Sequence, residues 1–356
     1  MSAIQLESIE KRWGETIAVK GINLAAEEGR FLVLLGPSGC GKSTTLRIIA
    51  GLESPSAGRV LINGSDVTHA PPSDRHLSMV FQSYALFPHL NTEENILFGL
   101  KVRKVPATER QQRLVKVAEL VGLVDYLDRK PAQLSGGQRQ RVALARAVIA
   151  ENPICLMDEP LSNLDAKLRH DMRVEIRSLQ RRLGMTVVYV THDQTEAMSM
   201  ADKVILMRDG TIEQEGTPGD LYDKPASTFT ARFIGTPPMN LLTMTSDSRG
   251  VLIEGTDSLV QSARPDSQLG VRPEHISIDH QSGIPATLTA SDYLGADTIV
   301  TAEVGSQQIM IRIPGRHTVN EEEHVFLRWL PESARLFDNK SGMLIDGNPV
   351  LSAATG

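Results

Sequence analysis

The sequence predicts an α/β unit built on a parallel sheet, followed by an all-β module. Residues 30–36, "RFLVLLG", form a continuous apolar run that ends in glycine, which is typical of a strand buried on both faces. Strand, helix and strand patterns then follow one another over residues 154–192. After residues 237–238 the chain consists of short alternating segments with Gly, Pro and Asn breaks, which indicates a sandwich or a small barrel.

The remaining elements follow from periodicity. Residues 4–24 contain the alternating segments "IQLESI" and "TIAVKGINL", which predict an antiparallel edge sheet. A helix is expected at "KSTTLRIIAG", with Gly51 as its stop signal. Helical spacing in "TERQQRLVKVAELVGL" and "QRQRVALARAVIA" predicts a mainly helical insertion at about 83–150. We therefore expect one unit over 1–235 and a β-rich unit over 236–356.

Composition narrows the class of protein. A net charge of −6 and a pI of about 5.9 argue against electrostatic binding of nucleic acid. Cys40 and Cys155 lack the spacing of a metal site, so we expect two reduced thiols. No signal peptide is expected, and apolar runs such as "FLVLL" are far shorter than the ~20 residues of a membrane helix. Any role at a membrane would be carried out from the water side or through a partner.

The segment "GPSGCGKS", Gly36 to Ser43, fits the phosphate-loop pattern G-x-x-x-x-G-K-[ST] between a predicted strand and a predicted helix. Its glycines let backbone N–H groups approach phosphate oxygens, Lys42 reaches the β- and γ-phosphates, and the Ser43 hydroxyl is suited to Mg²⁺. The expected nucleotide contacts are Gly36, Pro37, Ser38, Gly39, Cys40, Gly41, Lys42, Ser43 and Thr44.

Polar side chains follow two further buried strands. Asp158 and Glu159 end "ICLMDE", and His192 ends "TVVYVTH". Because ligands bind beyond the carboxyl ends of parallel strands, these residues should converge with Lys42 on the γ-phosphate. Asp158 would hold Mg²⁺, Glu159 would polarise the attacking water, and His192 would sense the γ-phosphate. A structural histidine is the other interpretation of His192.

Two more residues are candidates. Gln82 follows the short strand "SMVF", where its amide can reach the metal or the attacking water, or be a plain polar residue. Trp13 lies beside Gly14 in the N-terminal sheet and could stack on adenine, with core packing as the alternative.

A second anion site is predicted at "LSGGQ", where Ser135, Gly136 and Gly137 begin a helix. One triphosphate is already wrapped by the phosphate loop, and the long linkers at 83–95 and 124–134 argue against a fold-back within one chain. We therefore expect this site to serve a nucleotide held by a second copy, in a head-to-tail dimer with twofold symmetry. Hydrolysis would then release the dimer.

In their order, the phosphate loop, Gln82, "LSGGQ", "ICLMDEP", "SNLD" (162–165) and His192 resemble an ABC-type ATPase over residues 1 to about 235. The resemblance implies a P-loop ABC ATPase fold with a mixed sheet and a helical subdomain, and ATP and Mg²⁺ as cofactors. The catalytic set it implies is Glu159, His192 and Gln82, and the metal set is Ser43, Gln82 and Asp158. Across the dimer, and at the adenine, the implied contacts are Ser135, Gly136, Gly137, Gln138, Asp165 and Trp13.

The segments at 216–242 and 271–276 resemble ATP-binding subunits of bacterial carbohydrate importers, in which an OB-like TOBE domain follows the ATPase. "FIGTPPMNLL" and "YLGADT" (293–298) are most similar to the subset that serves sn-glycerol-3-phosphate uptake. Residues 241–268 match poorly. The expected function is ATP hydrolysis that powers solute import.

The same resemblance implies partners. Two membrane permeases would bind the segment 83–96, "SYALFPHLNTEENI", and a periplasmic solute-binding protein would take part indirectly. The apolar side chains Tyr84, Leu86, Phe87 and Leu90 either face that partner or pack into the helical insertion. A homodimer at the cytoplasmic face of the bacterial inner membrane is expected, without nucleic acid.

Several other functions share some of these sequence features. An importer for another sugar, polyol or oligosaccharide shares most of these motifs. A soluble ABC ATPase of DNA repair would carry sustained heptads, and one of translation would carry two phosphate loops; the sequence has neither. An exporter ATPase usually has fused membrane spans, and this sequence has no segment of that kind. A regulator that sequesters a transcription factor is disfavoured by the presence of both Glu159 and His192.

Overall fold

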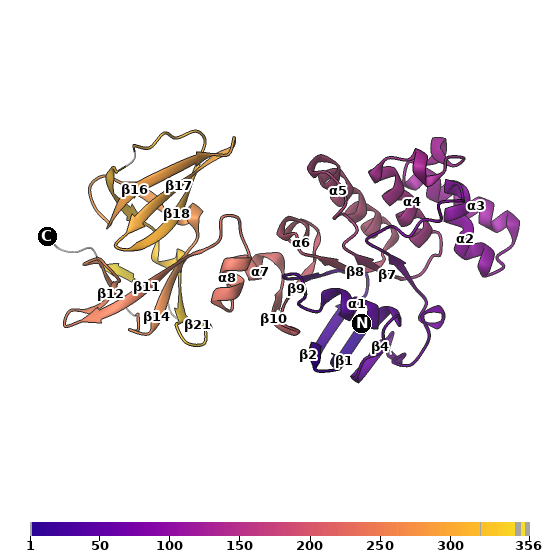
Figure 1. Cartoon of the computed structure of the whole chain (residues 1–356), viewed down its shortest axis with the longest axis horizontal. Helices are drawn as coiled ribbons and strands as arrows, with labels where there is room; N and C mark the ends of the chain where they lie inside the picture. The colour runs from indigo at the N-terminus through magenta and orange to yellow at the C-terminus, as the bar shows by residue number, and fades with distance from the viewer. Residues whose placement is uncertain (1, 262, 321, 346–349, 353–356) are drawn as a thin grey trace. The chain divides into compact units, whose positions relative to one another are not determined.

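A six-stranded sheet in the order β10-β9-β3-β8-β7-β6 forms the centre of the first unit (Figure 1). The computed structural model describes residues 2–261, 263–320, 322–345 and 350–352. Five strands are parallel and β10 is antiparallel to β9. The strands are β3 (Phe31–Leu35), β6 (Leu77–Val80), β7 (Ile154–Asp158), β8 (Thr186–Thr191), β9 (Lys203–Arg208) and β10 (Thr211–Gly216).

Every residue of β3, β7 and β8 is buried, which explains their continuous apolar runs. Leu35 pairs with Thr191, and Asp158 pairs with Val190, so the three strands end at the same edge. The predicted parallel α/β sheet is confirmed.

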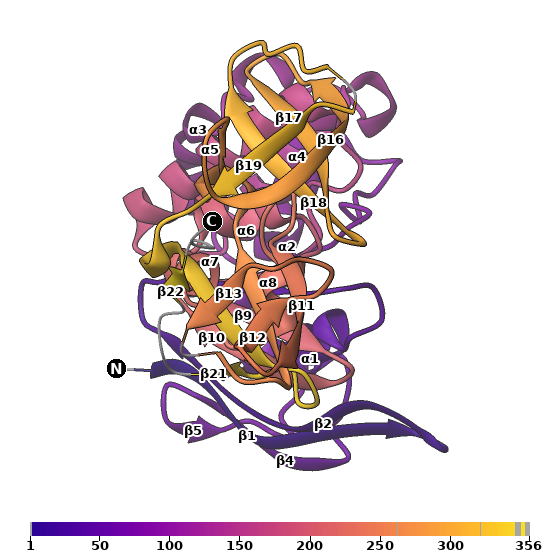
Figure 2. The same cartoon turned by 90° about the vertical axis from the view of Figure 1, so that its left-hand side faces the viewer.

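An antiparallel sheet in the order β2-β1-β4-β5 forms a second layer, which Figure 2 shows at the bottom. Its strands are β1 (Ser2–Trp13), β2 (Thr16–Glu27), β4 (Ala57–Ile62) and β5 (Ser65–Asp66). Helix α1 (Lys42–Ala50) ends at Gly51, as predicted, and packs between this sheet and the parallel one. One apolar cluster joins all three layers. The helix that follows the phosphate loop is therefore held on both sides.

The helices at 92–148 gather beyond the β6 end of the sheet, with α4 in contact with β6 (Figure 1): α2 (Thr92–Val102), α3 (Ala107–Leu120) and α4 (Gly136–Val148). Asn91 and Glu94 form a capping box that starts α2, so the linker after Gln82 is shorter than expected. Beyond β7 the chain forms α5 (Ala166–Leu183) and α6 (Gln194–Met200). Within the described part of the chain, no helix has both the length and the apolar character to cross a membrane.

The chain divides into two units, Met1–Gly219 and Asp220–Gly356. Helix α7 (Pro218–Asp223) spans this division and α8 (Thr228–Phe233) follows it. Both helices precede residue 236, where the sequence predicts the second unit to start, and that boundary stays a prediction.

The second unit contains a seven-stranded sheet in the order β21-β20-β14-β11-β12-β13-β22 and a five-stranded sheet in the order β15-β19-β16-β17-β18. Strands of both sheets share one apolar core, so the expected all-β module is present. The strands are β11 (Asn240–Asp247), β12 (Gly250–Ile253), β13 (Leu259–Gln261), β14 (Ser267–Val271), β15 (Ser277–Asp279), β16 (Ile284–Tyr293), β17 (Asp297–Val304), β18 (Gln307–Pro314), β19 (His324–Arg328), β20 (Ala334–Asp338), β21 (Leu344–Ile345) and β22 (Val350–Ser352).

Arg272, directly after β14, is a buried cation that organises the start of this unit. Its side chain is 2% exposed and donates hydrogen bonds to the carbonyls of Tyr222, Ala231 and Ile234. The guanidinium also lies 4.1 Å from the ring centroid of Tyr222. The last two carbonyls lie at the end of α8, where helical partners are absent. Arg272 therefore ties α7 and α8 to the β-rich sheets.

Replacing Arg272 with Met should destabilise the second unit by about 3 kcal/mol, because three carbonyls, two of them in buried hydrogen bonds, lose a charged donor. Urea unfolding followed by the fluorescence of Trp329 measures this, since Trp329 is buried in the same core and the other tryptophan, Trp13, is exposed. Arg249→Met is the matched control, because its ion pairs with aspartates lie at the surface, and its midpoint should stay unchanged. Equal midpoints for both variants would contradict the role of Arg272.

Candidate functional site

The phosphate loop encloses its own lysine. The Nζ atom of Lys42 donates to the carbonyls of Gly36 and Pro37, each at 2.8 Å, and the side chain is 5% exposed. A Cβ at Gly36, where φ is +151°, would lie 2.3 Å from the carbonyl oxygen of Met207. Gly41, with φ of +102°, is closed in the same way by a backbone oxygen at 2.6 Å. Only glycine permits this tight loop, and a buried ammonium at its centre fits the triphosphate of ATP.

Ser43 and Asp158 meet at the edge of the sheet. The Ser43 hydroxyl donates to Asp158 Oδ1 at 2.7 Å, and Asp158 is 6% exposed. A hydroxyl and a carboxylate on rigid elements are the oxygen donors that Mg²⁺ prefers, so this pair fits the ion. Gln82, the third predicted metal ligand, instead donates weakly to Glu159 and Ser162.

Glu159 lies between Gln82 and His192. Its Oε2 atom is 3.4 Å from Gln82 Nε2 and 3.3 Å from His192 Nδ1. Glu159 has a φ of +43°, which is uncommon for a side chain of its size, and its N–H donates to the Val190 carbonyl at 3.1 Å. The structure thus brings together the three residues that the sequence predicts as catalytic.

The segment "LSGGQ" begins α4 with a capping box. The N–H of Gln138 donates to Ser135 Oγ at 3.2 Å, and the N–H of Ser135 donates to Gln138 Oε1 at 2.9 Å. The N–H groups of Gly136 and Gly137 lie in the first turn and have no intrahelical acceptor. Among the described residues, no hydrogen bond or ion pair joins this segment to the phosphate loop.

Gly137 also serves packing. A Cβ there would lie 2.8 Å from a methyl carbon of Leu168 on α5, and one at Gly136 would lie 3.2 Å from Leu164. The sequence predicts a role for these glycines in anion binding alone. The structure adds that the start of α4 rests against the start of α5.

Two predicted site residues lie apart from this group. Asp165 caps α5 by accepting the N–H of Leu168 at 2.9 Å, and it is exposed. Trp13 is 49% exposed at the end of β1, with Lys11 Nζ 5.4 Å from its ring centroid. The prediction that Trp13 packs in the core is therefore wrong, and its stacking on adenine stays a prediction.

The segment 83–96 is shaped by residues that sequence reasoning missed. Asn95 is fully buried; its amide donates to the carbonyls of residues 87, 90 and 91 and accepts the N–H of Phe87. Arg146 on α4 donates to the carbonyls of Tyr84 and Ala85. A buried Asn and a loop-binding Arg look like ordinary surface residues in a sequence, so no local pattern could reveal them.

The apolar side chains of this segment divide into two kinds. Tyr84 is 7% exposed, so it packs inside and is not available to a partner. Leu86, Phe87 and Leu90 are half-buried, and Phe87 packs on Phe98 with ring centroids 4.3 Å apart. Phe98 itself is 39% exposed, so an aromatic surface remains.

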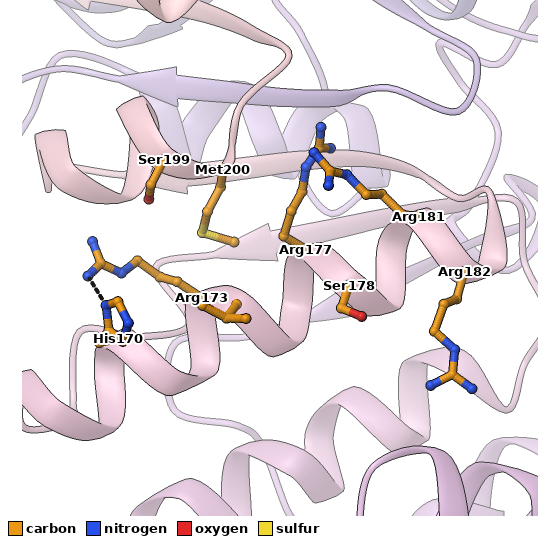
Figure 3. Close-up of a pocket in the computed structure, with 9 residues that line it drawn as sticks. His170, Arg173, Arg177, Ser178, Arg181, Arg182, Ser199 and Met200 are labelled. Carbon is orange, nitrogen blue, oxygen red and sulfur yellow. Dashed lines mark hydrogen bonds between the residues drawn. The ribbon is translucent and has the colours of Figure 1, made fainter.

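A separate cleft of about 410 Å³ lies between α5 and α6 (Figure 3). Arginines from α5, among them Arg173, Arg177 and Arg181, line it. It contains none of the predicted site residues, so the candidate site is the edge of the sheet.

Known families match both units. The family described as "ABC transporter" matches residues 19–162, and the "TOBE domain" matches residues 269–337. The chain is 45% identical to "sn-glycerol-3-phosphate import ATP-binding protein UgpC 3" of Rhizobium etli, over 97% of this chain and 100% of that protein. It is 42% identical to UgpC of Escherichia coli (strain K12), again over 97% and 100%.

Solved structures of ABC transporter ATPases also match part of the chain. The dimeric structure of the bacterial ABC transporter cassette MJ0796 matches with a TM-score of 0.55 and 35% identity, covering 60% of this chain and 98% of that one. CbiO1 of Clostridium perfringens, part of the ABC transporter complex cbiONQ, matches with a TM-score of 0.59 and 26% identity, covering 63% and 91%. With this likeness over nearly its whole length, the chain belongs to the ATP-binding subunits of the ABC transporter family and carries a C-terminal TOBE domain.

Proposed function

We propose that this chain is the subunit that hydrolyses ATP to power an importer of sn-glycerol-3-phosphate, with Glu159 as its general base. The observation that carries this proposal is the Glu159 carboxylate, which lies between Gln82 and His192 at the strand ends beside the phosphate loop. Relatives that match the whole chain are named as sn-glycerol-3-phosphate import ATP-binding proteins.

The residues of the site divide the work. Lys42 and the loop N–H groups would bind the phosphates of ATP, and Ser43 and Asp158 would hold Mg²⁺. The ion, when bound, would supply positive charge that offsets the charge of the phosphates. Glu159 takes the proton of the attacking water. His192, within 3.3 Å of Glu159, orients that carboxylate, and Gln82 limits its movement from the other side.

A second copy completes the site. The N–H groups of Gly136 and Gly137, which have no intrahelical acceptor, form with the Ser135 hydroxyl an anion site that, among the described residues, has no hydrogen bond or ion pair to the phosphate loop of its own chain. In a head-to-tail homodimer each copy lends Ser135–Gln138 to the other, with Asp165 at the same seam and Trp13 on adenine. ATP closes the dimer, and hydrolysis reopens it.

Two membrane permeases bind the segment 83–96, and through them a periplasmic solute-binding protein acts on the cycle. The support is the aromatic pair of Phe87, five residues after Gln82, and the exposed Phe98 on α2. The chain then acts at the cytoplasmic face of the bacterial inner membrane. Movement of Gln82 against Glu159 would report permease position to the hydrolysis site.

Glu159→Gln should lower kcat for ATP hydrolysis by at least about 100-fold, because the general base is lost while the shape of the side chain is kept. Binding of Mg·ATP should persist, and the variant should accumulate as a dimer in size-exclusion chromatography. Glu151→Gln is the control, since Glu151 is exposed and pairs with Arg113 only at the surface. Unchanged turnover in Glu159→Gln would overturn the assignment of the base.

Mixing two inactive variants tests whether the site is shared. Lys42→Met removes the phosphate-loop cation and Ser135→Arg blocks the second anion site. In a head-to-tail mixed dimer one site receives both defects and the other receives none, so turnover should return to roughly a quarter of the wild-type rate. If each chain used its own Ser135, both sites of the mixed dimer would be dead and turnover would stay absent.

The substrate is tested by uptake. In Escherichia coli lacking UgpC, which is 42% identical to this chain, expression of the chain should restore uptake of radiolabelled sn-glycerol-3-phosphate. Glu159→Gln should not restore it. Restored uptake of another sugar or oligosaccharide instead, or active purified ATPase that no permease stimulates, would point to a different importer or to an ATPase uncoupled from transport.

A further inference from the structure

Arg169, on the first turn of α5, joins two loops that flank the candidate site. Its Nη2 atom donates to the carbonyl of Leu164 at 3.0 Å, and its Nη1 atom lies 3.4 Å from Asp193 Oδ2. Leu164 belongs to the segment "SNLD" (162–165), and Asp193 directly follows His192. One guanidinium thus bridges the segment that precedes α5 and the loop that carries His192.

Buried hydrogen bonds also hold the loop of His192 on the side that faces β8 and α6. Glu196 is 3% exposed and accepts hydrogen bonds from the hydroxyls of Tyr189, at 2.9 Å, and Thr191, at 2.6 Å. Thr191 Oγ1 in turn accepts the N–H of Asp193 at 2.9 Å. Burial removes the Glu196 carboxyl from water and raises its pKa. The loop is fixed to β8 and α6, and Arg169 fixes it to the segment 162–165.

The same segment is tied to Gln82. Asn163 Nδ2 donates to the Gln82 carbonyl at 3.0 Å, and Ser162 Oγ accepts from Gln82 Nε2 at 3.3 Å. The segment 162–165 therefore lies between the two groups that contact Glu159, with Arg169 as the link on the His192 side.

A small cavity supports this arrangement. It has a volume of about 40 Å³ and is lined by Glu159, Ser162, Arg169, His192 and Glu196, among others. The Nε atom of Arg169 is buried and has no hydrogen-bond partner within the described residues. The space is enough for one water, which would be a partner for this donor. Arg169 therefore lines the same cavity as Glu159 and His192, and within the described residues it has no hydrogen bond or ion pair with the phosphate loop.

We propose that Arg169 is a positioning residue for hydrolysis, which locks the His192 loop to the segment 162–165 and so sets the spacing between His192 and Glu159. The proposal rests on the proposed function of Glu159. Asp165, the predicted contact with the neighbouring subunit, lies in the same segment. A shift of that subunit would therefore change the position of His192 through Arg169. A guanidinium is suited to this role because it donates to two acceptors in fixed directions, whereas a lysine ammonium is a single point charge.

Three single variants and one double variant test the link. Arg169→Lys and Arg169→Met should lower kcat by about 10- to 100-fold, because the catalytic pair loses its geometry. The KM for ATP should change by less than about twofold, since no phosphate contact is lost. Asp193→Asn should act in the same direction, and Asn still caps α6. The double variant Arg169→Met/Asp193→Asn should be no slower than either single variant, as expected for one shared interaction.

Arg173→Met is the matched control. Arg173 lies one turn further along α5 and points to His170, as Figure 3 shows, with a hydrogen bond to its ring at 3.4 Å. Its kcat and thermal midpoint should equal those of the wild type. Wild-type kcat in both Arg169 variants, additive losses in the double variant, or equal losses of kcat, ATP binding and thermal stability would overturn the proposal. Full activity of Glu159→Gln would instead overturn the proposed function.

Discussion

The parallel register of β3, β8 and β7 is the constraint on which the site depends. Leu35 pairs with Thr191, and Asp158 pairs with Val190, so the phosphate loop, the His192 loop and the Asp158–Glu159 pair all begin at one edge. Every residue in these strands is buried, so a slip by one position would move apolar side chains out of two packed faces. The apolar core therefore fixes the catalytic distances.

Much of this edge could be predicted from the sequence because its signals are local. The phosphate loop is one contiguous motif whose glycines are required by backbone contacts such as that of Gly36 with Met207. Asp158, Glu159 and His192 follow buried strands, and a general rule about parallel sheets places strand ends together. The convergence of Glu159, His192 and Gln82 needed no knowledge of side-chain packing, although their chemical roles stay predictions.

The residues that escaped prediction are polar groups whose partners lie elsewhere in the chain. Asn95 and Arg272 are buried and form their hydrogen bonds with backbone groups, and a sequence gives no sign of such burial. Arg169 reads as one of many charges on an exposed helix. Tyr84 and Trp13 show the same limit for aromatic residues: the one expected at a partner surface is buried, and the one open to core packing is exposed.

The glycines of "LSGGQ" connect anion binding with dimer contact. Because Gly136 and Gly137 leave room for Leu164 and Leu168, the start of α4 is seated on the start of α5. The anion site at Ser135 and the exposed Asp165 are consequently presented together by one packed pair of helix N-termini. A larger residue at position 137 would separate these helices as well as obstruct the anion. Glycine is therefore required for two physical reasons, anion binding and the packing of α4 on α5. This packing by itself makes the anion site and Asp165, the two elements of the predicted seam, move together.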